Sequence, residues 1–212
     1  MIELRRRYSA VSGGGDIEIP KLPEGYQRIE YTEQTDNTQW LVLPITKGFV
    51  GNIRARIYSD VNVAAGRGFR VALGWNDGAQ IGLKYSNSKW YWQNYNVTSI
   101  EFVNGKIHDV RLNINNTDSI LYLDEEELVR NTLFNNTSQM VVFSSTSAAL
   151  VPFIGRFYEL FIDGIMDGVE ISMKLYPARK VVDGTIGMFD VPNGIFYSSA
   201  GTGNFTAGAD ID

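Results

Sequence analysis

Two tight-turn signals near the end of the sequence constrain the fold more than any other feature. Asp183-Gly184 and Asn193-Gly194 are dipeptides that accept the positive φ angles of tight hairpin turns. Each lies between short runs that are rich in β-branched and aromatic residues, so residues 175–198 are predicted to form three antiparallel strands. Apolar side chains alternate along the middle strand, residues 185–190, and this piece therefore needs a larger sheet on which to pack.

The rest of the sequence continues the pattern of short strands separated by turn residues. Residues 52–58 alternate cleanly, with apolar side chains on one face and Arg54, Arg56 and Tyr58 on the other, which indicates a strand with one solvated face. About fourteen strands at intervals of ~8 to 15 residues, with no convincing helix, favour an all-β, two-sheet antiparallel sandwich over any βαβ architecture. The other predicted strands are residues 28–32, 39–43, 69–75, 80–85, 89–93, 106–114, 119–123, 128–130, 139–143, 157–162 and 168–176.

Two motifs near the ends of the sequence carry a family resemblance. They read LPEGYQRIEYTEQTDNTQWLVLP from Leu22 and LYPARKVVDGTIGMFDVPNGIFYSSAGTGNFTAG from Leu175. With them the chain resembles the concanavalin A-like (LamG-like) jelly-roll family, whose domains recur in proteins of tailed bacteriophages and in surface proteins of gut bacteria. The resemblance brackets residues 22–208 and implies a jelly-roll sandwich of two antiparallel sheets. Where the family usually has a Gly-Thr-Gln-Tyr stretch, this chain reads Asp36-Asn-Thr-Gln-Trp40, a change that leaves the strand intact.

The first residues differ in composition from the rest of the chain. We therefore divide it into an extended N-terminal arm with a glycine-rich hinge, residues 1–21, and a concanavalin A-like β-sandwich, residues 22–212. One interpretation of the arm is a solvated tail. The other is a segment that docks on a neighbouring subunit, with its arginines pairing carboxylates and its apolar side chains filling shallow pockets. The candidate partner-binding residues are Leu4, Arg5, Arg6, Arg7 and Tyr8.

Composition argues against several classes of protein. The 212 residues include 19 basic and 24 acidic side chains and no cysteine, which gives a formal net charge of −5. An acidic surface does not favour nucleic acid as the main partner, and the lack of cysteine excludes disulfides and thiolate chemistry. Because no signal-peptide core and no run of ~18 apolar residues occurs, the chain is expected to be soluble and to have no membrane partner.

The acidic residues and the single histidine do not form a recognisable catalytic motif, so neither enzymatic activity nor a cofactor is expected. The glucanase motif of this fold, E-x-D-x-x-E, is absent. The groups of acids that come nearest to such a motif are Asp16 with Glu18 and the turn at residues 124–127. We interpret the acidic turn as solvated. Alternation places His108 on a buried face, so it is predicted to be a core or edge residue and not a catalytic base.

No metal site is predicted from the sequence. A site made of two or three histidines is impossible in a chain with one histidine. A calcium site with oxygen ligands stays open, although the acids of the predicted loops lack the spacing of a recognised calcium loop. These acids are Asp60, Asp77, Asp118 and Asp163.

An aromatic run around residue 92 is the remaining candidate binding site. Sugars are bound by aromatic faces against their C–H surfaces and by amide or carboxylate groups against their hydroxyls, so the composition fits a glycan platform. The alternative is that Trp90 and Trp92 point inward as part of the sandwich core. The candidate glycan-binding residues are Tyr91, Trp92, Asn94 and Tyr95.

The leading functional hypothesis follows from the resemblance. It is a non-enzymatic structural protein of a bacteriophage particle, such as a head-surface, collar or tail-fibre component assembled in the host cytoplasm and located in the virion. Through its arm it would dock on other virion proteins or on copies of itself. The alternative is a carbohydrate-binding, lectin-like adhesin or surface module, and a glycoside hydrolase is a third hypothesis. The Asn-x-Ser/Thr sequons at Asn96, Asn115, Asn135 and Asn204 are interpreted as ordinary turn asparagines.

Overall fold

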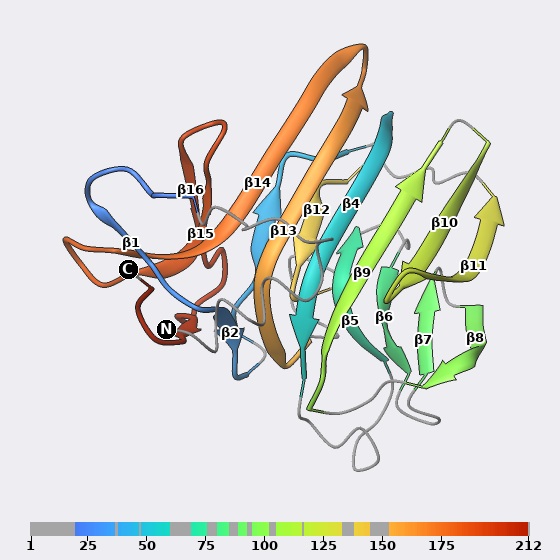
Figure 1. Cartoon of the computed structure of the whole chain (residues 1–212), viewed down its shortest axis with the longest axis horizontal. Coiled ribbons are helices and arrows are strands. Elements are labelled where there is room, and N and C mark those ends of the chain that lie inside the picture. The colour runs from blue at the N-terminus through green and yellow to red at the C-terminus, as the bar shows by residue number, and fades with distance from the viewer. Residues whose placement is uncertain are drawn as a thin grey trace, which may run out of the picture.

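The strands predicted from alternating residues form two antiparallel sheets that pack face to face (Figure 1). The structure is a computed structural model, and it describes residues 20–36, 38–46, 48–59, 69–75, 80–84, 89–92, 95–101, 105–115, 117–132, 138–144 and 153–211. In residues 69–71, 80–84, 89–92, 95–101 and 131–132 the backbone alone is described. The arrangement is a jelly-roll sandwich, so the predicted fold class is confirmed. The predicted arm, apart from its last two residues, lies outside the described residues.

The larger sheet lies in front in Figure 1, with its long central strands side by side. Its strand order is β11-β10-β9-β4-β13-β14-β15-β16, while β1 pairs with β14 and β2 pairs with both β13 and β17. The strands are β1 Tyr26–Arg28, β2 Thr32–Gln34, β4 Phe49–Tyr58, β9 Ile107–Ile114, β10 Asp118–Leu123, β11 Glu126–Thr132, β13 Gly155–Met166, β14 Val169–Lys180, β15 Ile186–Asp190, β16 Ile195–Ser198 and β17 Thr206–Ala207.

The smaller sheet lies behind the larger one in Figure 1. Its strand order is β3-β12-β5-β6-β7-β8. Strand β8 was not predicted from the sequence. The strands are β3 Leu41–Leu43, β5 Phe69–Trp75, β6 Gln80–Lys84, β7 Lys89–Trp92, β8 Tyr95–Glu101 and β12 Met140–Val142.

The hydrophobic core fills the space between the sheets, as the period-two pattern of β4 requires. Every second residue of β4 faces inward, namely Ile53, Ala55 and Ile57, and all three are buried. From the smaller sheet, Trp75 is fully buried and its indole N–H donates to the carbonyl of Ile45 at 3.2 Å. The face of the larger sheet that carries Arg54, Arg56 and Tyr58 is therefore the outer face of the sandwich.

Phe143 occupies an unusual place in this core. It is fully buried and has a φ of 69°, a region that bulky residues rarely adopt. Its ring centroid lies 4.5 Å from that of Phe157 and 5.0 Å from that of Phe205. The backbone is held by two hydrogen bonds: the Phe143 N–H donates to the carbonyl of Ala72, and the Phe153 N–H donates to that of Phe143, each at 2.8 Å. The conformation is thus fixed from several directions.

The C-terminal meander predicted from its two turns is confirmed. Gly184 and Gly194 have φ angles of 73° and 67°, in the left-handed region that these turns need. The middle strand, β15, buries side chains on both faces, because Met188 joins the main core and Phe189 packs in a second apolar cluster with Leu22.

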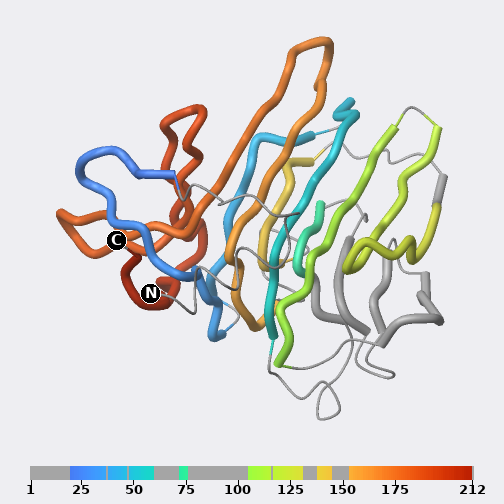
Figure 2. The backbone as a smooth tube through the Cα atoms, viewed as in Figure 1, coloured from blue at the N-terminus to red at the C-terminus, as the bar shows by residue number. Residues whose placement is uncertain are grey.

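The C-terminal end of the described chain, red in Figure 2, lies beside the blue segment that contains β1. Ile29 bridges Asp210, and the N–H of Ile211 donates to the carbonyl of Arg28 at 2.9 Å. The single strand predicted at residues 28–32 is therefore wrong in its detail, because the bridge separates β1 from β2. Within the described ranges there is no helix that is long and apolar enough to cross a membrane.

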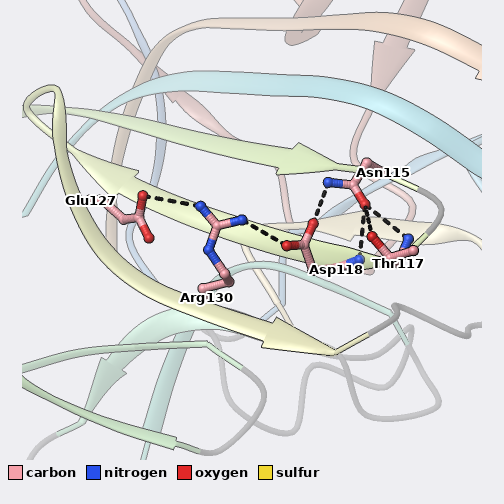
Figure 3. Close-up of polar contacts among 5 residues, drawn as sticks. All are labelled: Asn115, Thr117, Asp118, Glu127 and Arg130. Carbon is pink, nitrogen blue, oxygen red and sulfur yellow. Dashed lines mark hydrogen bonds and ion pairs between the residues drawn. The ribbon is translucent and has the colours of Figure 1, made fainter.

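The turn between β9 and β10 confirms the interpretation of one sequon asparagine (Figure 3). The Asn115 Oδ1 accepts hydrogen bonds from the Thr117 N–H at 2.8 Å, the Thr117 hydroxyl at 2.9 Å and the Asp118 N–H at 2.9 Å. Its Nδ2 donates to the Asp118 carboxylate, which also accepts from the Arg130 Nη1 at 2.7 Å. Asn115 is thus an Asx-turn residue whose side chain is occupied by the turn itself.

Candidate functional site

The outer face of the larger sheet carries a depression of about 990 Å³. It lies where β4 ends and where β9 and β13 begin, and the segment between β1 and β2 and the β10–β11 turn complete its wall. We define the depression by its described lining residues, Glu30, Tyr31, Arg56, Tyr58, Gly105, Lys106, Ile107, Asp109, Asp124, Glu125, Arg156 and Tyr158. Segments far apart in sequence thus supply aromatic, basic and acidic groups to one place.

Three tyrosines and one arginine form the aromatic part of the depression. The Arg156 guanidinium carbon lies 4.3 Å from the ring centroid of Tyr31 and 4.9 Å from that of Tyr58. The Tyr31 and Tyr158 rings meet edge to face, with centroids 5.8 Å apart. Burial raises the pKa of Tyr158 to about 12 against the opposing effect of Arg156, and burial is also the main cause of the raised pKa of Tyr31. Both hydroxyls therefore stay protonated near neutral pH and can donate a hydrogen bond.

A β-bulge in β13 positions Tyr158. The register against β4 shifts between Phe157 and Glu159, so one extra residue is inserted on β13. Phe157 faces the core, whereas both Tyr158 and Glu159 reach the outer side, where Tyr158 lines the depression and Glu159 lies 4.0 Å from Arg56. Without the bulge, strict alternation would turn Glu159 into the core.

Arg156 is held in place by Glu33, which is not a lining residue of the depression. Its Nε donates to the Glu33 Oε1 at 2.8 Å, and the hydroxyl of Thr206 lies 3.2 Å from the other carboxylate oxygen of Glu33. Burial alone would lower the pKa of Arg156, but the hydrogen bond and charge of Glu33 outweigh it and the pKa is raised. The guanidinium is therefore a permanent cation with a fixed orientation.

Asp124 departs from the expectation that the turn at residues 124–127 is simply solvated. Its carboxylate accepts from the Lys106 Nζ at 2.7 Å and from the Asp109 N–H at 2.9 Å, and it lies 3.0 Å from the His108 Nδ1. Partial burial would raise the pKa of Asp124, but these hydrogen bonds and the charges of its partners lower it below the ordinary value. Asp124 is consequently a structural anchor of the wall of the depression.

His108 lies where the alternation of its strand predicted. Only 2% of its surface is exposed, and it is the Cα partner of Ile57 in the β4–β9 ladder. Its contact with Asp124 connects the turn to the inner side of the sheet. The prediction of a core or edge histidine is confirmed.

The glycan platform and the docking arm predicted from the sequence stay untested. Tyr91 and Trp92 lie on β7 and Tyr95 lies on β8, where Trp92 and Tyr95 are directly opposite each other. Only the backbone is described there, and Asn94 lies outside the described residues. The docking candidates Leu4, Arg5, Arg6, Arg7 and Tyr8 also lie outside them. The hairpin belongs to the smaller sheet, whereas the depression lies on the larger one.

The lining residues of the depression were not predicted as a site. One signal was present in the sequence, because the solvated face of residues 52–58 includes Arg56 and Tyr58. Tyr31 and Arg156 reach the site from segments that are 125 positions apart, and no local pattern connects them.

The arrangement is suited to binding a polyhydroxylated ligand. Aromatic rings pack against sugar C–H groups, while guanidinium, ammonium and carboxylate groups form hydrogen bonds with hydroxyls. In the part of the chain that the structure describes, no group of three or more His, Asp or Glu side chains is arranged to hold a metal ion.

Comparisons with known proteins give the fold and not a family. No family model matches the chain. No curated protein matches it either. Among solved structures, the chain is similar to the crystal structure of a protein from Bacteroides ovatus proposed to bind carbohydrate, with a TM-score of 0.59 and 14% identity over 87% of this chain and 62% of that one. A heptameric SAP-like pentraxin from Limulus polyphemus aligns with a TM-score of 0.43 and 10% identity over 70% of this chain and 81% of that one. The chain thus spans less than two thirds of the Bacteroides ovatus protein and shares its fold.

Proposed function

We propose that this chain is a carbohydrate-binding, lectin-like module that holds a glycan in the depression on the outer face of its larger sheet. The observation that carries the proposal is the convergence of Tyr31, Tyr58 and Tyr158 around the fixed guanidinium of Arg156. The similarly folded protein from Bacteroides ovatus, itself proposed to bind carbohydrate, supports it.

The polar groups of the depression are arranged for neutral hydroxyls. Lys106 and Arg156 each already donate to a carboxylate, Asp124 and Glu33 respectively, and keep further N–H groups for a ligand. Glu30 and Glu125 add carboxylates that accept hydrogen bonds from sugar hydroxyls. A sugar bound here would replace water on the tyrosine rings and at these groups together.

We also propose that binding is not followed by hydrolysis. A glycosidase needs one carboxyl that is protonated at working pH and a second that is ionised. Asp109 receives hydrogen bonds from Arg54, and the partners of Asp124 lower its pKa, so these two carboxylates of the depression serve the structure. The expected result of incubating the protein with the glycan that it binds is no increase in reducing ends.

The bacteriophage role stays a prediction. It depended on the family resemblance and on the N-terminal arm, and the arm lies outside the described residues. The described residues offer no observation that favours a head, collar or tail-fibre location. A glycan-binding sandwich is compatible with a surface position on a particle or on a cell.

The test is a glycan array followed by titration calorimetry with the best ligand. We expect Tyr58→Ala to weaken binding at least tenfold and Glu125→Gln to weaken it several-fold, with thermal unfolding of each variant showing a folded protein. The matched control is Glu126→Gln, which makes the same change at the next residue, the first of β11, outside the depression. Equal affinity of the Tyr58→Ala variant and the wild type would contradict the proposal.

A further inference from the structure

We infer that the depression is one end of a longer binding surface, and that a row of side chains across the outer face of the larger sheet binds acidic units of the same glycan chain. This inference rests on the proposed function. The row consists of Tyr122, Arg111, Arg54, Phe161 and Lys174, on β10, β9, β4, β13 and β14 respectively.

The register of the sheet places these five residues in one line. Arg111 is the Cα partner of both Tyr122 and Arg54, and Phe161 is the partner of both Arg54 and Lys174. All five alternate with core residues, so their side chains share the outer face. With about 4.8 Å between neighbouring strands, the row is about 19 Å long, which is enough for several sugar units.

The row is continuous with the depression. On β9, Asp109 lines the depression and Arg111, two residues further along, lies in the row; on β4, Arg56 and Arg54 have the same relationship. Two residues of a strand cover about 7 Å, so a bound chain can pass from one to the other without leaving the surface. The Arg54 Nε joins the two parts by donating to both carboxylate oxygens of Asp109, at 2.9 and 3.1 Å.

The charge of the row differs from that of the whole protein. The chain has a net charge of −5, yet the row holds three cations and no carboxylate. Arg54 is engaged by Asp109, whereas Arg111 and Lys174 are exposed. The position beyond Tyr122 on β11 is Glu127, which pairs with Arg130 at 3.5 Å. Two exposed cations on an acidic protein provide the charge complement of an acidic ligand.

Aromatic rings accompany these cations. The Arg111 guanidinium carbon lies 4.2 Å from the ring centroid of Tyr122, and the ring of Phe161 meets that of Tyr176 edge to face at 5.4 Å. Tyr122 and Phe161 are partly exposed. A sugar ring that carries a carboxylate can lie against an aromatic ring while its charge meets Arg111 or Lys174.

The next row along the strands supplies groups for hydroxyls. The Asn113 Nδ2 donates to the Asn52 Oδ1 at 3.0 Å, and the Ser172 hydroxyl donates to the Asp163 Oδ1 at 2.8 Å. Asn52 and Asp163 are exposed and are Cα partners of each other. The two rows together present aromatic, cationic and amide groups, with the carboxylate of Asp163 in the second row, on the outer face of the sheet.

The test uses linear uronate hexasaccharides with galacturonate, glucuronate and mannuronate backbones, each paired with its carboxyl-reduced, neutral counterpart. We expect at least one uronate to bind more than fivefold tighter than its neutral counterpart, and the difference to shrink as NaCl is raised. The Arg111→Gln/Lys174→Gln double variant should remove this difference, so that the uronate binds no tighter than its neutral counterpart. The Lys21→Gln/Lys180→Gln double variant removes the same charge away from the row and should behave like the wild type.

The outcomes separate the two proposals. If Arg111→Gln/Lys174→Gln keeps the preference for the uronate, or if no uronate is preferred, the inference about the row is overturned. If neutral chains still bind and Tyr58→Ala abolishes this binding, the depression stands as the glycan site without the row. Absence of binding to every hexasaccharide and to the glycan array would overturn both.

Discussion

Arg54 and Asp109 form a diagonal pair across β4 and β9, although neither is the direct ladder partner of the other. Asp109 lies opposite Arg56, and Arg54 lies opposite Arg111. The Asp109 carboxylate is nevertheless bound by the Arg54 Nε, while Arg56 turns to Glu159 at a distance of 4.0 Å. Burial raises the pKa of Glu159 against the effect of Arg56, so this second pair is the weaker one. The diagonal contact of Arg54 with Asp109 is thus closer than the ladder contact of Arg56 with Glu159.

Removing either partner of this diagonal pair should destabilise the sandwich modestly. Asp109→Asn and Arg54→Gln are each expected to lower the free energy of unfolding by about 1 kcal/mol, because the pair is forked but partly exposed. Urea unfolding of both single variants and of the double variant gives the coupling energy directly. Additive effects of the two substitutions would show that the pair contributes nothing measurable.

Asp124 should make the protein sensitive to acid. Its folded pKa lies below the ordinary value of 3.8, so the stability that it contributes is present above that value and is lost as pH falls through the folded pKa. We expect Asp124→Asn to lower the free energy of unfolding at pH 7 and to lose this effect near pH 2, measured by urea unfolding at both pH values. Glu126→Gln, which removes an exposed carboxylate at the first residue of β11, is the control. A deficit of equal size at both pH values would disprove the role of the charge.

Substitutions of Phe143 should show an inverted order of stability, with the glycine variant more stable than the alanine variant. Truncation to alanine loses the contacts with Phe157 and Phe205 and should cost about 3–5 kcal/mol of unfolding free energy. Glycine is usually worse than alanine in regular structure, but at a φ of 69° it relieves backbone strain. We therefore expect Phe143→Gly to be more stable than Phe143→Ala by about 1 kcal/mol. The reverse order in thermal or urea unfolding would show that the backbone there is unstrained.

The Asx turn at Asn115 should hold the β9–β10 hairpin together. Asn115→Ala removes three hydrogen bonds accepted by the side-chain oxygen and should lower the free energy of unfolding by about 1–2 kcal/mol. Hydrogen exchange of the Thr117 and Asp118 amides should become faster in this variant. Asn204→Ala changes an exposed asparagine of another sequon and should have little effect. Unchanged exchange at residues 117 and 118 would contradict the role of the side chain.

Local chemistry explains which parts of the fold were predictable. The turns at Gly184 and Gly194 depend on residues that accept a positive φ, and β4 depends on alternation of apolar and polar residues. The turns and the strand can therefore be recognised from the local sequence. Strand β8 was missed because the alternation of Tyr95–Glu101 breaks at Thr98 and Ser99, where two polar residues follow each other. The predicted strand at residues 28–32 failed because a bridge from Ile29 to distant Asp210 divides it.

The site was less predictable than the fold for a physical reason. Tyr158 reaches the depression through a bulge, and an inserted residue has no signal in an alternating pattern. Tyr31 and Arg156 meet only after β2 and β13 have paired. The aromatic run that the sequence did emphasise lies on the other sheet, where its side chains are not described.

The bridge between Ile29 and Asp210 has a consequence for how the protein is made. Strand β2 lies between β13 and β17 in the sheet. Both partners of this strand are synthesised more than a hundred residues after it. Contacts of such long range slow folding, because the ends of a long loop must meet before either gains stability. Strands β1 and β2 must therefore wait, unpaired, until β14 and β13 have been made. Release of a chain cut short before Thr206 should leave β2 with an open edge.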